Sequence, residues 1–335
     1  MRGLQIVDGY TSALTLRETQ KAIKLVKDTF ANELAAALNL ERVSAPFIVR
    51  KGSGINDDLN GVERKVEFDT KEIEGTAEIV QSLAKWKRTA LKAYGYGVDE
   101  GLYTNMNAIR RDDDCDNVHS IFVDQWDWER VISKEERNID FLKDIVKKIV
   151  GAIDNTQKIA HKAFPQLKNE LATDVFFVTT QELEDMYPDK TPKEREDIIA
   201  KEKGVVFVMQ IGDLLKSGIK HDGRAPDYDD WKLNGDLLFW NETLRHAFEV
   251  SSMGIRVDSE SLAYQLKAAN AEDRMKYDYH KGIADGTLPL TIGGGIGQSR
   301  LSMLILEKAH IGEVQVSLWP DKMVEDCKNN GINLL

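Results

Sequence analysis

The sequence predicts an α+β fold in which a mostly antiparallel β-sheet is flanked by helices. Short β-rich segments follow one another between residues 63 and 130 in a hairpin-like run, which favours antiparallel pairing. The strict alternation of strands and helices that is typical of a doubly wound parallel sheet is absent from the sequence. No repeat, low-complexity tract or Pro/Gly/Ser linker divides the 335 residues. We therefore expect a single domain, 1–335, with a helical/α-β insertion at about 133–204.

The first half of the chain is predicted to begin with a helix and to continue with short strands. Thr15 to Glu18 form a capping box, and apolar residues then recur at helical spacing as far as Leu38. A strand is expected over 41–50, broken at Pro46, and a loop over 52–61. Further strands are predicted at 65–68, 77–80, 102–109 and 119–128, with a helix at 82–93.

The second half is predicted to combine long helices with further strands. Another capping box, Ser133 to Glu136, predicts the start of a long helix whose apolar residues continue to Ile159. Thr191 followed by Pro192 predicts the start of a helix between strands at 175–178 and 205–211. We also expect strands at 235–240, 247–257 and 288–292, charged helices over 259–285, a glycine turn over 293–297 and a helix over 298–308.

The composition excludes several classes of protein. With 42% hydrophobic and 30% charged residues, the chain is typical of a globular protein and not of a disordered one. Its net charge of −11 argues against a broad nucleic-acid-binding surface, which needs positive charge. Cys115 and Cys327 cannot build a disulfide framework, and no apolar run approaches the ~18 residues of a membrane span. We therefore expect a cytoplasmic protein that binds neither nucleic acid nor membrane.

A glycine-rich segment, Gly293 to Arg300, lies between an apolar strand and an apolar helix. It lacks the Gly-Lys-Ser/Thr end of a phosphate loop, and Arg300 stands where a dinucleotide fingerprint has its third glycine. Because glycine lets the backbone approach a ligand closely, one interpretation is a turn that delivers Arg300 to a binding site. The alternative is a tight strand–helix turn with a solvent-facing arginine.

Polar side chains alternate along the strand predicted near residue 125. Gln125, Asp127 and Glu129 fall on one face, whereas the tryptophans between them fall on the other. Polar groups are costly to bury without partners. The face is therefore either the exposed side of a half-buried sheet or the floor of a polar site, over which Arg110 from the end of the preceding strand could hang.

Two acidic residues lie on strands that are expected to be neighbours. Asp236 and Glu249 could bind Mg²⁺, which usually takes one or two carboxylates and completes its shell with phosphates and water. The alternative is turn chemistry and solvated charge, which is the better interpretation for Asp230. Lys87 lies one turn into a helix that Ser82 could cap, and it could either reach a carboxylate or be solvated. No zinc spacing and no nucleophile–base arrangement is evident.

Together these segments resemble the catalytic core of class II aminoacyl-tRNA synthetases. That core has three motifs: a helix–strand with a proline, a strand–loop–strand with Arg-x-Asp/Glu, and a glycine-rich stretch ending in Arg. They match 34–46, 110–127 and 293–300 of this sequence. Over nearly the whole chain, the sequence is similar to the ammonia-dependent asparagine synthetase (aspartate–ammonia ligase) family. The long segments that carry this similarity are 81–88, 100–104, 123–129, 224–231, 251–258 and 291–301.

The resemblance implies a reaction, two cofactors and a fold. Aspartate and MgATP would give β-aspartyl-AMP and pyrophosphate, and ammonia would then give asparagine and AMP. Arg110 would bridge the β-carboxylate and the α-phosphate, and Arg300 would lie on the adenine near the γ-phosphate. The residues implied to bind the nucleotide are Val118, Ser120, Asp236, Glu249, Gly295 and Arg300, with Asp236 and Glu249 as the Mg²⁺ ligands. The expected fold is a single class II synthetase-like catalytic domain, and its first motif implies a homodimer.

The resemblance also implies how aspartate and ammonia are bound. The residues that would bind aspartate are Ser82, Lys87, Gln125, Asp127, Asp229, Ser251 and Ser252. Asp127 would accept from the α-ammonium and Lys87 would pair with the α-carboxylate, so that charges at both ends set the length of the substrate and reject glutamate. Asp57 would meet ammonia and accept a proton as a general base. The residues implied to be catalytic are Asp57, Arg110, Gln125 and Arg300.

Two departures and two competing interpretations accompany the resemblance. Gln81 stands where the family has His, and the segment 231–234 is short where relatives carry a longer loop. An aspartyl- or asparaginyl-tRNA synthetase would need an anticodon-binding domain, which we do not expect because a helix begins near Thr15. A non-catalytic paralogue would bind aspartate or a nucleotide without turnover. Glutamine is not the expected nitrogen donor, because neither Cys115 nor Cys327 has a recognisable partner.

Overall fold

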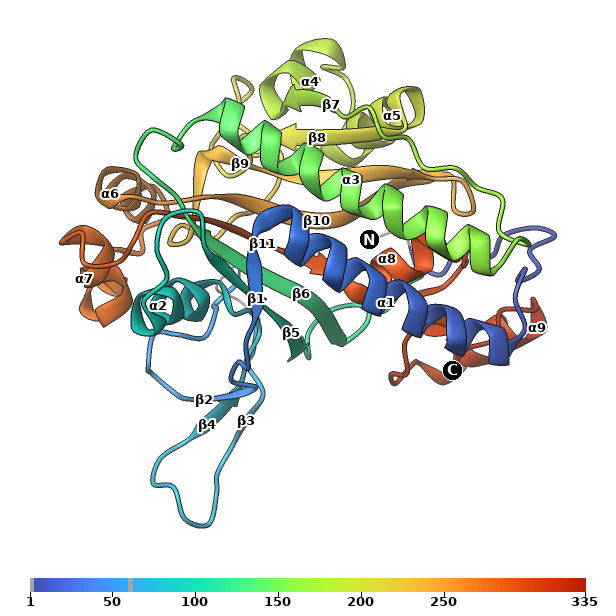
Figure 1. The fold of residues 1–335 in the computed structure, drawn as a ribbon, viewed down its shortest axis with the longest axis horizontal. Coiled ribbons are helices and arrows are strands. Elements are labelled where there is room, and N and C mark those ends of the chain that lie inside the picture. The colour runs from blue at the N-terminus through green and yellow to red at the C-terminus, as the bar shows by residue number, and fades with distance from the viewer. Residues whose placement is uncertain (1–2, 60–62) are drawn as a thin grey trace.

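A large twisted sheet forms the centre of the computed structural model, which describes residues 3–59 and 63–335 (Figure 1). Its strands, in spatial order, are β1 (Leu40–Arg42), β5 (Gly101–Ile109), β6 (Phe122–Val131), β11 (Thr291–Gly297), β10 (His246–Arg256), β9 (Asp229–Asn241), β8 (Val205–Met209) and β7 (Phe176–Thr179). The outer pairs β1·β5 and β7·β8 are parallel, and the five pairs between them are antiparallel. The predicted α+β fold with a mostly antiparallel sheet is confirmed.

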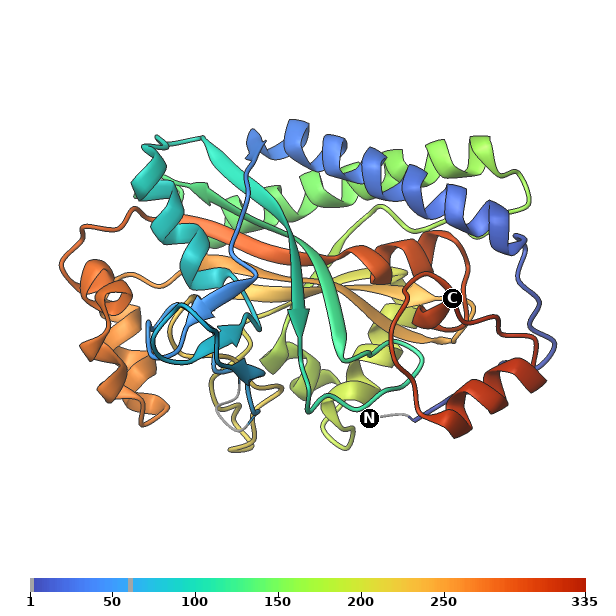
Figure 2. The same cartoon turned by 90° about the horizontal axis from the view of Figure 1, so that it is seen from below.

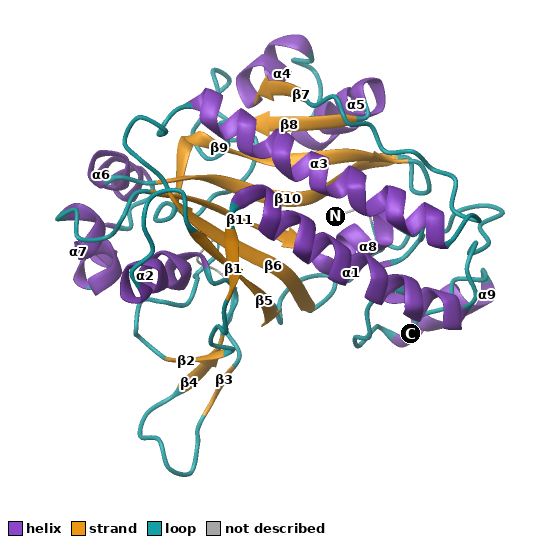
Figure 3. Cartoon of the chain, viewed as in Figure 1, coloured by secondary structure: helices purple, strands orange, loops and turns teal. Residues whose placement is uncertain are grey.

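A second, small sheet projects from the main body (Figures 1 and 3). It is formed by β2 (Ile48–Arg50), β4 (Ala77–Ile79) and β3 (Glu67–Phe68), in that order. The helices described by the structure are α1 (Leu16–Leu38), α2 (Ala84–Tyr94), α3 (Ile139–Ala163), α4 (Thr180–Met186), α5 (Pro192–Lys203), α6 (Ser259–Ala268), α7 (Asp278–Ala284), α8 (Gln298–Ile305) and α9 (Asp321–Asn329), with 3-10 turns η1 (Glu272–Lys276) and η2 (Ile311–Glu313).

Helices α1 and α3 lie side by side over one face of the large sheet (Figure 2). The Thr15 capping box is present, and α1 buries its apolar stripe against the sheet. Phe30 packs on Trp126 of β6 with ring centroids 4.6 Å apart. Because both tryptophans of β6 belong to this core, alternation along the strand turns its polar side chains to the opposite face.

The glycines at 293–297 form a strand and not the predicted turn. β11 extends through Gly297 and pairs with β6 on one side and β10 on the other. A side chain at Gly293 or Gly295 would overlap the side chains of Glu129 or Gln125, and one at Gly294 would overlap Met253. Glycine is needed here because neighbouring strands fill the space on both faces, a property that local sequence does not reveal.

Other predicted elements differ at their ends. Ser133 and Glu136 exchange hydrogen bonds, but they close a turn, and α3 begins three residues later behind Asn138, whose side chain accepts from the N–H of Phe141 at 2.9 Å. The segment 41–50 divides, as predicted, near Pro46, and its halves join different sheets. Helices α4 and α9 were not predicted, although α4 carries its own capping box at Thr179.

Residues 133–204 contribute α3, β7, α4 and α5. α3 packs on α1, and β7 extends the large sheet, so both belong to the same layers as the rest of the chain. The short segment 231–234 lies within the continuous strand β9. In the part of the chain that the structure describes, no helix has the length and apolarity needed to cross a membrane.

Candidate active site

A polar cavity of about 640 Å³ lies beside β6, on the side where Gln125 and Asp127 project away from the core that contains Trp126 and Trp128. Its floor is formed by β6, β10 and β11, and its walls by the loop 54–59, the start of α2 and the segments 110–120 and 222–229. The predicted residues that line it are Asp57, Ser82, Lys87, Arg110, Val118, Ser120, Gln125, Asp127, Asp229, Glu249, Ser252, Gly295 and Arg300. The floor of a polar site is therefore the correct interpretation of the alternating face of β6.

Arg110 and Arg300 face this one cavity from segments that are far apart in sequence. Arg110 follows β5, where its backbone N–H donates to the carbonyl of Ile121 at 2.9 Å. Its Nε is buried without a hydrogen-bond partner among the described residues. The Nη1 of Arg300 donates to the carbonyl of Glu249 at 3.0 Å and lies 3.7 Å from the carboxylate of that residue. The solvent-facing alternative for Arg300 is thus wrong.

The placement of Arg300 depends on Asp124, which the sequence did not single out. Helix α8 starts behind Gly297, which has no side chain to cap it. Asp124 of β6 replaces the missing cap, because it accepts from the N–H of Ser299 at 3.0 Å and from its hydroxyl at 2.8 Å. Lys27 of α1 pairs with the same carboxylate at 2.7 Å. No local pattern could identify Asp124, since its partners come from α1 and α8.

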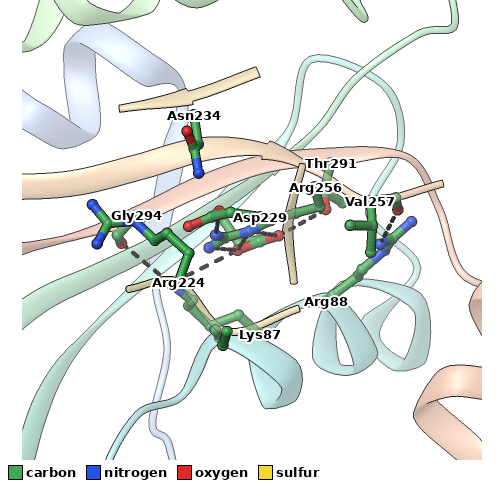
Figure 4. Close-up of polar contacts among 12 residues, drawn as sticks. Lys87, Arg88, Arg224, Asp229, Asn234, Arg256, Val257, Thr291 and Gly294 are labelled. Atoms are coloured by element: carbon green, nitrogen blue, oxygen red, sulfur yellow. Dashed lines mark hydrogen bonds and ion pairs between the residues drawn. The ribbon is translucent and has the colours of Figure 1, made fainter. Parts of the chain in front are cut away.

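Lys87 is buried, so the solvated alternative for it is wrong. Its ammonium donates to the carboxylate of Asp127, to the carbonyl of Trp128 at 2.9 Å and to the carbonyl of Gly294 at 3.2 Å (Figure 4). It therefore joins α2, β6 and β11 directly under the cavity. Ser82 is not the N-cap residue of α2, a position that Leu83 takes, but its hydroxyl accepts from the N–H of Ala84 at 3.1 Å.

A buried ion network continues from this floor (Figure 4). Arg256 of β10 makes a two-pronged contact with Glu129, with its Nε at 3.0 Å and its Nη2 at 2.7 Å from the carboxylate oxygens, and it also pairs with Asp229. Thr291 donates to Glu129 at 2.7 Å. Burial opposes ionisation of Glu129, but Arg256 and Lys87 hold the pKa of its carboxyl below the ordinary value.

Two arginines that line the cavity were not assigned a role from the sequence, although both lie in segments that carry the family resemblance. Arg256 lines the cavity in the network just described, and Arg224 lines it while pairing with Asp236. Their positions within 224–231 and 251–258 were the sequence feature that could have identified them as site residues.

The two adjacent serines differ in orientation. Ser252 lines the cavity, whereas Ser251 does not, and the hydroxyl of Ser251 is buried without a partner among the described residues. The expectation for Ser251 is corrected, since neighbouring residues of a strand face opposite sides.

Asp236 and Glu249 lie on the adjacent strands β9 and β10, as predicted. Burial, together with the charge of Glu249, raises the pKa of Asp236 to about 6 in spite of the ion pair with Arg224. Glu249 lines the cavity and Asp236 lies behind Arg224. Among residues 3–59 and 63–335 there is no group of three His, Cys, Asp or Glu side chains placed to hold a metal. Two close carboxylates beside a cavity lined by Arg110 and Arg300 nevertheless fit Mg²⁺, which usually takes only one or two from the protein.

Asp57 lies on the loop wall of the cavity. Its Oδ1 accepts from the N–H of Leu59 at 3.1 Å, and its buried Oδ2 has no partner among the described residues. Burial raises the pKa of Asp57 above the ordinary value. Gln81 does not line the cavity. It supports this loop from behind, because its backbone N–H donates to the side chain of Asn56 at 2.9 Å.

The sequence is similar to one known protein family over nearly its whole length. A family model described as aspartate-ammonia ligase matches residues 17–331. A protein of Clostridium tetani named aspartate--ammonia ligase is 61% identical over 97% of this chain and 96% of its own length. A protein of the same name from Lactobacillus johnsonii is 60% identical over 97% of this chain and 98% of its own.

Solved structures with a similar fold are class II synthetases. The asparaginyl-tRNA synthetase of Pyrococcus horikoshii complexed with asparaginyl-adenylate has a TM-score of 0.65 at 16% identity, over 90% of this chain and 70% of that one. The asparaginyl-tRNA synthetase of Entamoeba histolytica has a TM-score of 0.61 at 16% identity, over 89% of this chain and 67% of that one. At these identities the likeness shows the fold alone. The family match and the full-length relatives show more, and the chain belongs to the aspartate–ammonia ligase family.

Proposed function

We propose that this chain synthesises asparagine from aspartate and ammonia at the expense of ATP, through a β-aspartyl adenylate, with release of AMP and pyrophosphate. Family membership supports this reaction. The observation that carries it is that Arg110 and Arg300 line the same cavity as a cluster of carboxylates. A cavity that holds arginines and carboxylates side by side suits a triphosphate held next to a zwitterionic amino acid.

Adenylation requires the β-carboxylate of aspartate to approach the negatively charged α-phosphate. Arg110 is assigned to both groups, because its guanidinium faces the cavity and its Nε lacks a partner among the described residues. Arg300 is assigned to the adenine and the γ-phosphate, with Val118, Ser120 and Gly295 around the base. Asp236 and Glu249 are the proposed Mg²⁺ ligands. The cation, when bound, would offset the negative charge that develops on the leaving pyrophosphate.

The Lys87–Asp127 pair is assigned to the α-amino and α-carboxylate groups of aspartate. These two side chains already form an ion pair of opposite charges under the cavity, and a zwitterion can pair with both members at once. Gln125, Ser82 and Ser252, which line the same cavity, are assigned to the remaining contacts with the substrate. Because the ion pair and Arg110 lie at opposite ends of the substrate, the distance between them would select aspartate over glutamate.

Asp57 is assigned to ammonia, together with Asp229, which lines the same cavity. The ionised carboxylate of Asp57 would attract ammonium and take one proton from it, leaving NH₃. The nitrogen would then attack the β-carbonyl carbon, a C–N bond would form, the bond to the AMP oxygen would break, and the nitrogen would lose a second proton to give the amide.

Two broader assignments complete the proposal. We assign a homodimer that uses the first class II motif, an assignment supported by the exposure of Phe47 and Ile48, 42% and 49%, beside that motif. We assign the cytoplasm, supported by the two cysteines, Cys115 and Cys327, which are both free thiols.

The test uses purified protein with MgATP, aspartate and ammonium. We expect AMP, pyrophosphate and asparagine in equal amounts, and no AMP when aspartate or ammonium is omitted. Transfer of the activated acid to tRNA in place of ammonium would identify a tRNA synthetase instead. Binding of ATP and aspartate without any turnover would identify a non-catalytic paralogue.

A further inference from the structure

A buried cluster of charged side chains lies behind the loop that carries Asp57. Its centre is Asp227, whose Oδ2 lies 3.1 Å from the Nζ of Lys85, 2.9 Å from the Nη1 of Arg274 and 2.9 Å from the Nε2 of His280. These partners come from α2, η1 and α7, and none of the four side chains is among the described residues that line the cavity. Burial opposes ionisation of Asp227, but its neighbours hold the pKa of its carboxyl well below the ordinary value.

Lys85 connects this cluster to the loop. Its Nζ also donates to the carbonyl of Asn56 at 3.4 Å. The side chain of Asn56 donates in turn to Glu78 at 2.9 Å and to the carbonyl of Ile79 at 3.1 Å. The chain immediately before Asp57 is therefore fixed from outside the cavity, while Asp57 itself lines the cavity and its Oδ2 has no partner among the described residues.

Charged and titratable groups from several elements face Asp57. They are Lys85 of α2, Arg110 after β5, Arg274 of η1, and Asp227 and Tyr228 of the segment before β9. Burial raises the pKa of Asp57, Lys85 and Arg110 act against that rise, and Asp227 adds to it. Lys85 and Asp227 therefore act on Asp57 with opposite sign, although they form an ion pair with each other.

We propose that Lys85 and Asp227 are positioning residues that together set the fraction of Asp57 carrying a negative charge, with Lys85 favouring the ionised form and Asp227 opposing it. The proposal rests on the function assigned to Asp57 above, since only the ionised carboxylate can attract ammonium and take its proton. The pair thus tunes the step that uses ammonia without touching any substrate.

The test measures kcat/KM for ammonium across pH in Lys85→Met and Asp227→Asn. Each value is divided by that of the wild type at the same pH, so that the ionisation of ammonium itself cancels. Loss of Lys85 moves the ionisation of Asp57 to higher pH, so the ratio of Lys85→Met to wild type should fall as the pH falls. Loss of Asp227 moves the ionisation of Asp57 to lower pH, so the ratio of Asp227→Asn to wild type should rise as the pH falls. We expect a displacement of about one pH unit in each direction, or about tenfold in the ratio, as for one charged neighbour of a carboxyl.

A purely structural role of Lys85 and Asp227 would not make the kcat/KM ratios of the two variants change with pH in opposite directions. Lys85→Arg keeps the charge and should restore a flat ratio. Lys65→Met is the matched control, because it removes a lysine that pairs at 2.6 Å with Asp58 of the same loop and is not one of the groups that face Asp57. Its ratio should be flat.

Slopes that are flat, or of the same sign, in folded variants overturn the proposal. If the buried variants fail to fold, Arg274→Met decides the matter, because its side chain is 15% exposed and its loss also removes a cation that faces Asp57. Its ratio should fall with falling pH, and a flat or rising ratio overturns the proposal. Failure of the ligase assignment looks different, because the wild type itself would then release no AMP in response to ammonium.

Discussion

Replacing Arg300 with alanine should damage the use of ATP far more than the fold. The Arg300 side chain is 21% exposed, and its partners are the backbone carbonyl of Glu249 at 3.0 Å and the carboxylate of that residue at 3.7 Å. A partly exposed ion pair contributes about 0–1 kcal/mol to stability, and a single hydrogen bond contributes about 1 kcal/mol. The free energy of unfolding should therefore fall by only about 1–2 kcal/mol.

The loss for ATP is larger because a guanidinium–phosphate contact is charge-assisted. One such hydrogen bond is worth about 1.5–3 kcal/mol, which corresponds to a rise of about 10- to 150-fold in the KM for ATP. The assay is pyrophosphate release at varied ATP concentration, paired with thermal unfolding of the same preparation. Arg17→Ala, which removes an exposed arginine from α1, is the control and should leave both measurements unchanged. An Arg300→Ala protein that is unfolded, or one with an unchanged KM for ATP, would refute the reasoning.

Three further predictions concern Asp124, His310 and Cys115. Asp124→Ala removes the cap of α8 and should lower stability by about 1–2 kcal/mol and raise the KM for ATP; an ATP titration with an unchanged KM would contradict this. Burial lowers the pKa of His310 from 6.5 to about 4, so the stability that its neutral form contributes is complete above pH 6.5 and is lost as the pH falls through about 4. The free energy of unfolding in urea should therefore lose about 3 kcal/mol of its pH dependence between these values in His310→Asn. An unchanged dependence of that free energy on pH would count against this prediction. Cys115→Ser should leave asparagine formation largely intact, because this thiol does not line the cavity, and a large loss of activity would overturn that expectation.

The glycine strand illustrates why the fold and the site were predictable to different degrees. Local sequence correctly indicated an apolar strand, glycines and a helix that starts near residue 298. Whether the glycines form a turn or an extended strand depends on the side chains of the strands that flank them, β6 and β10. Glu129 and Gln125 on β6 and Met253 on β10 fill that space, and these residues are remote in sequence.

The sequence by itself determined the fold class, the helical stripe of α1, the polar face of β6 and the family, because each depends on periodicity or on long matched segments. Most of the site residues that it named line the cavity. Only the tertiary structure decided that Arg110 and Arg300 share one cavity, that Lys87 is buried in an ion pair, that Ser251 faces away and that Asp124 caps α8. The physical reason is that side-chain partners, burial and electrostatic neighbours come from strands and helices that only the folded chain brings together, and one residue of register decides which side of a strand faces the site.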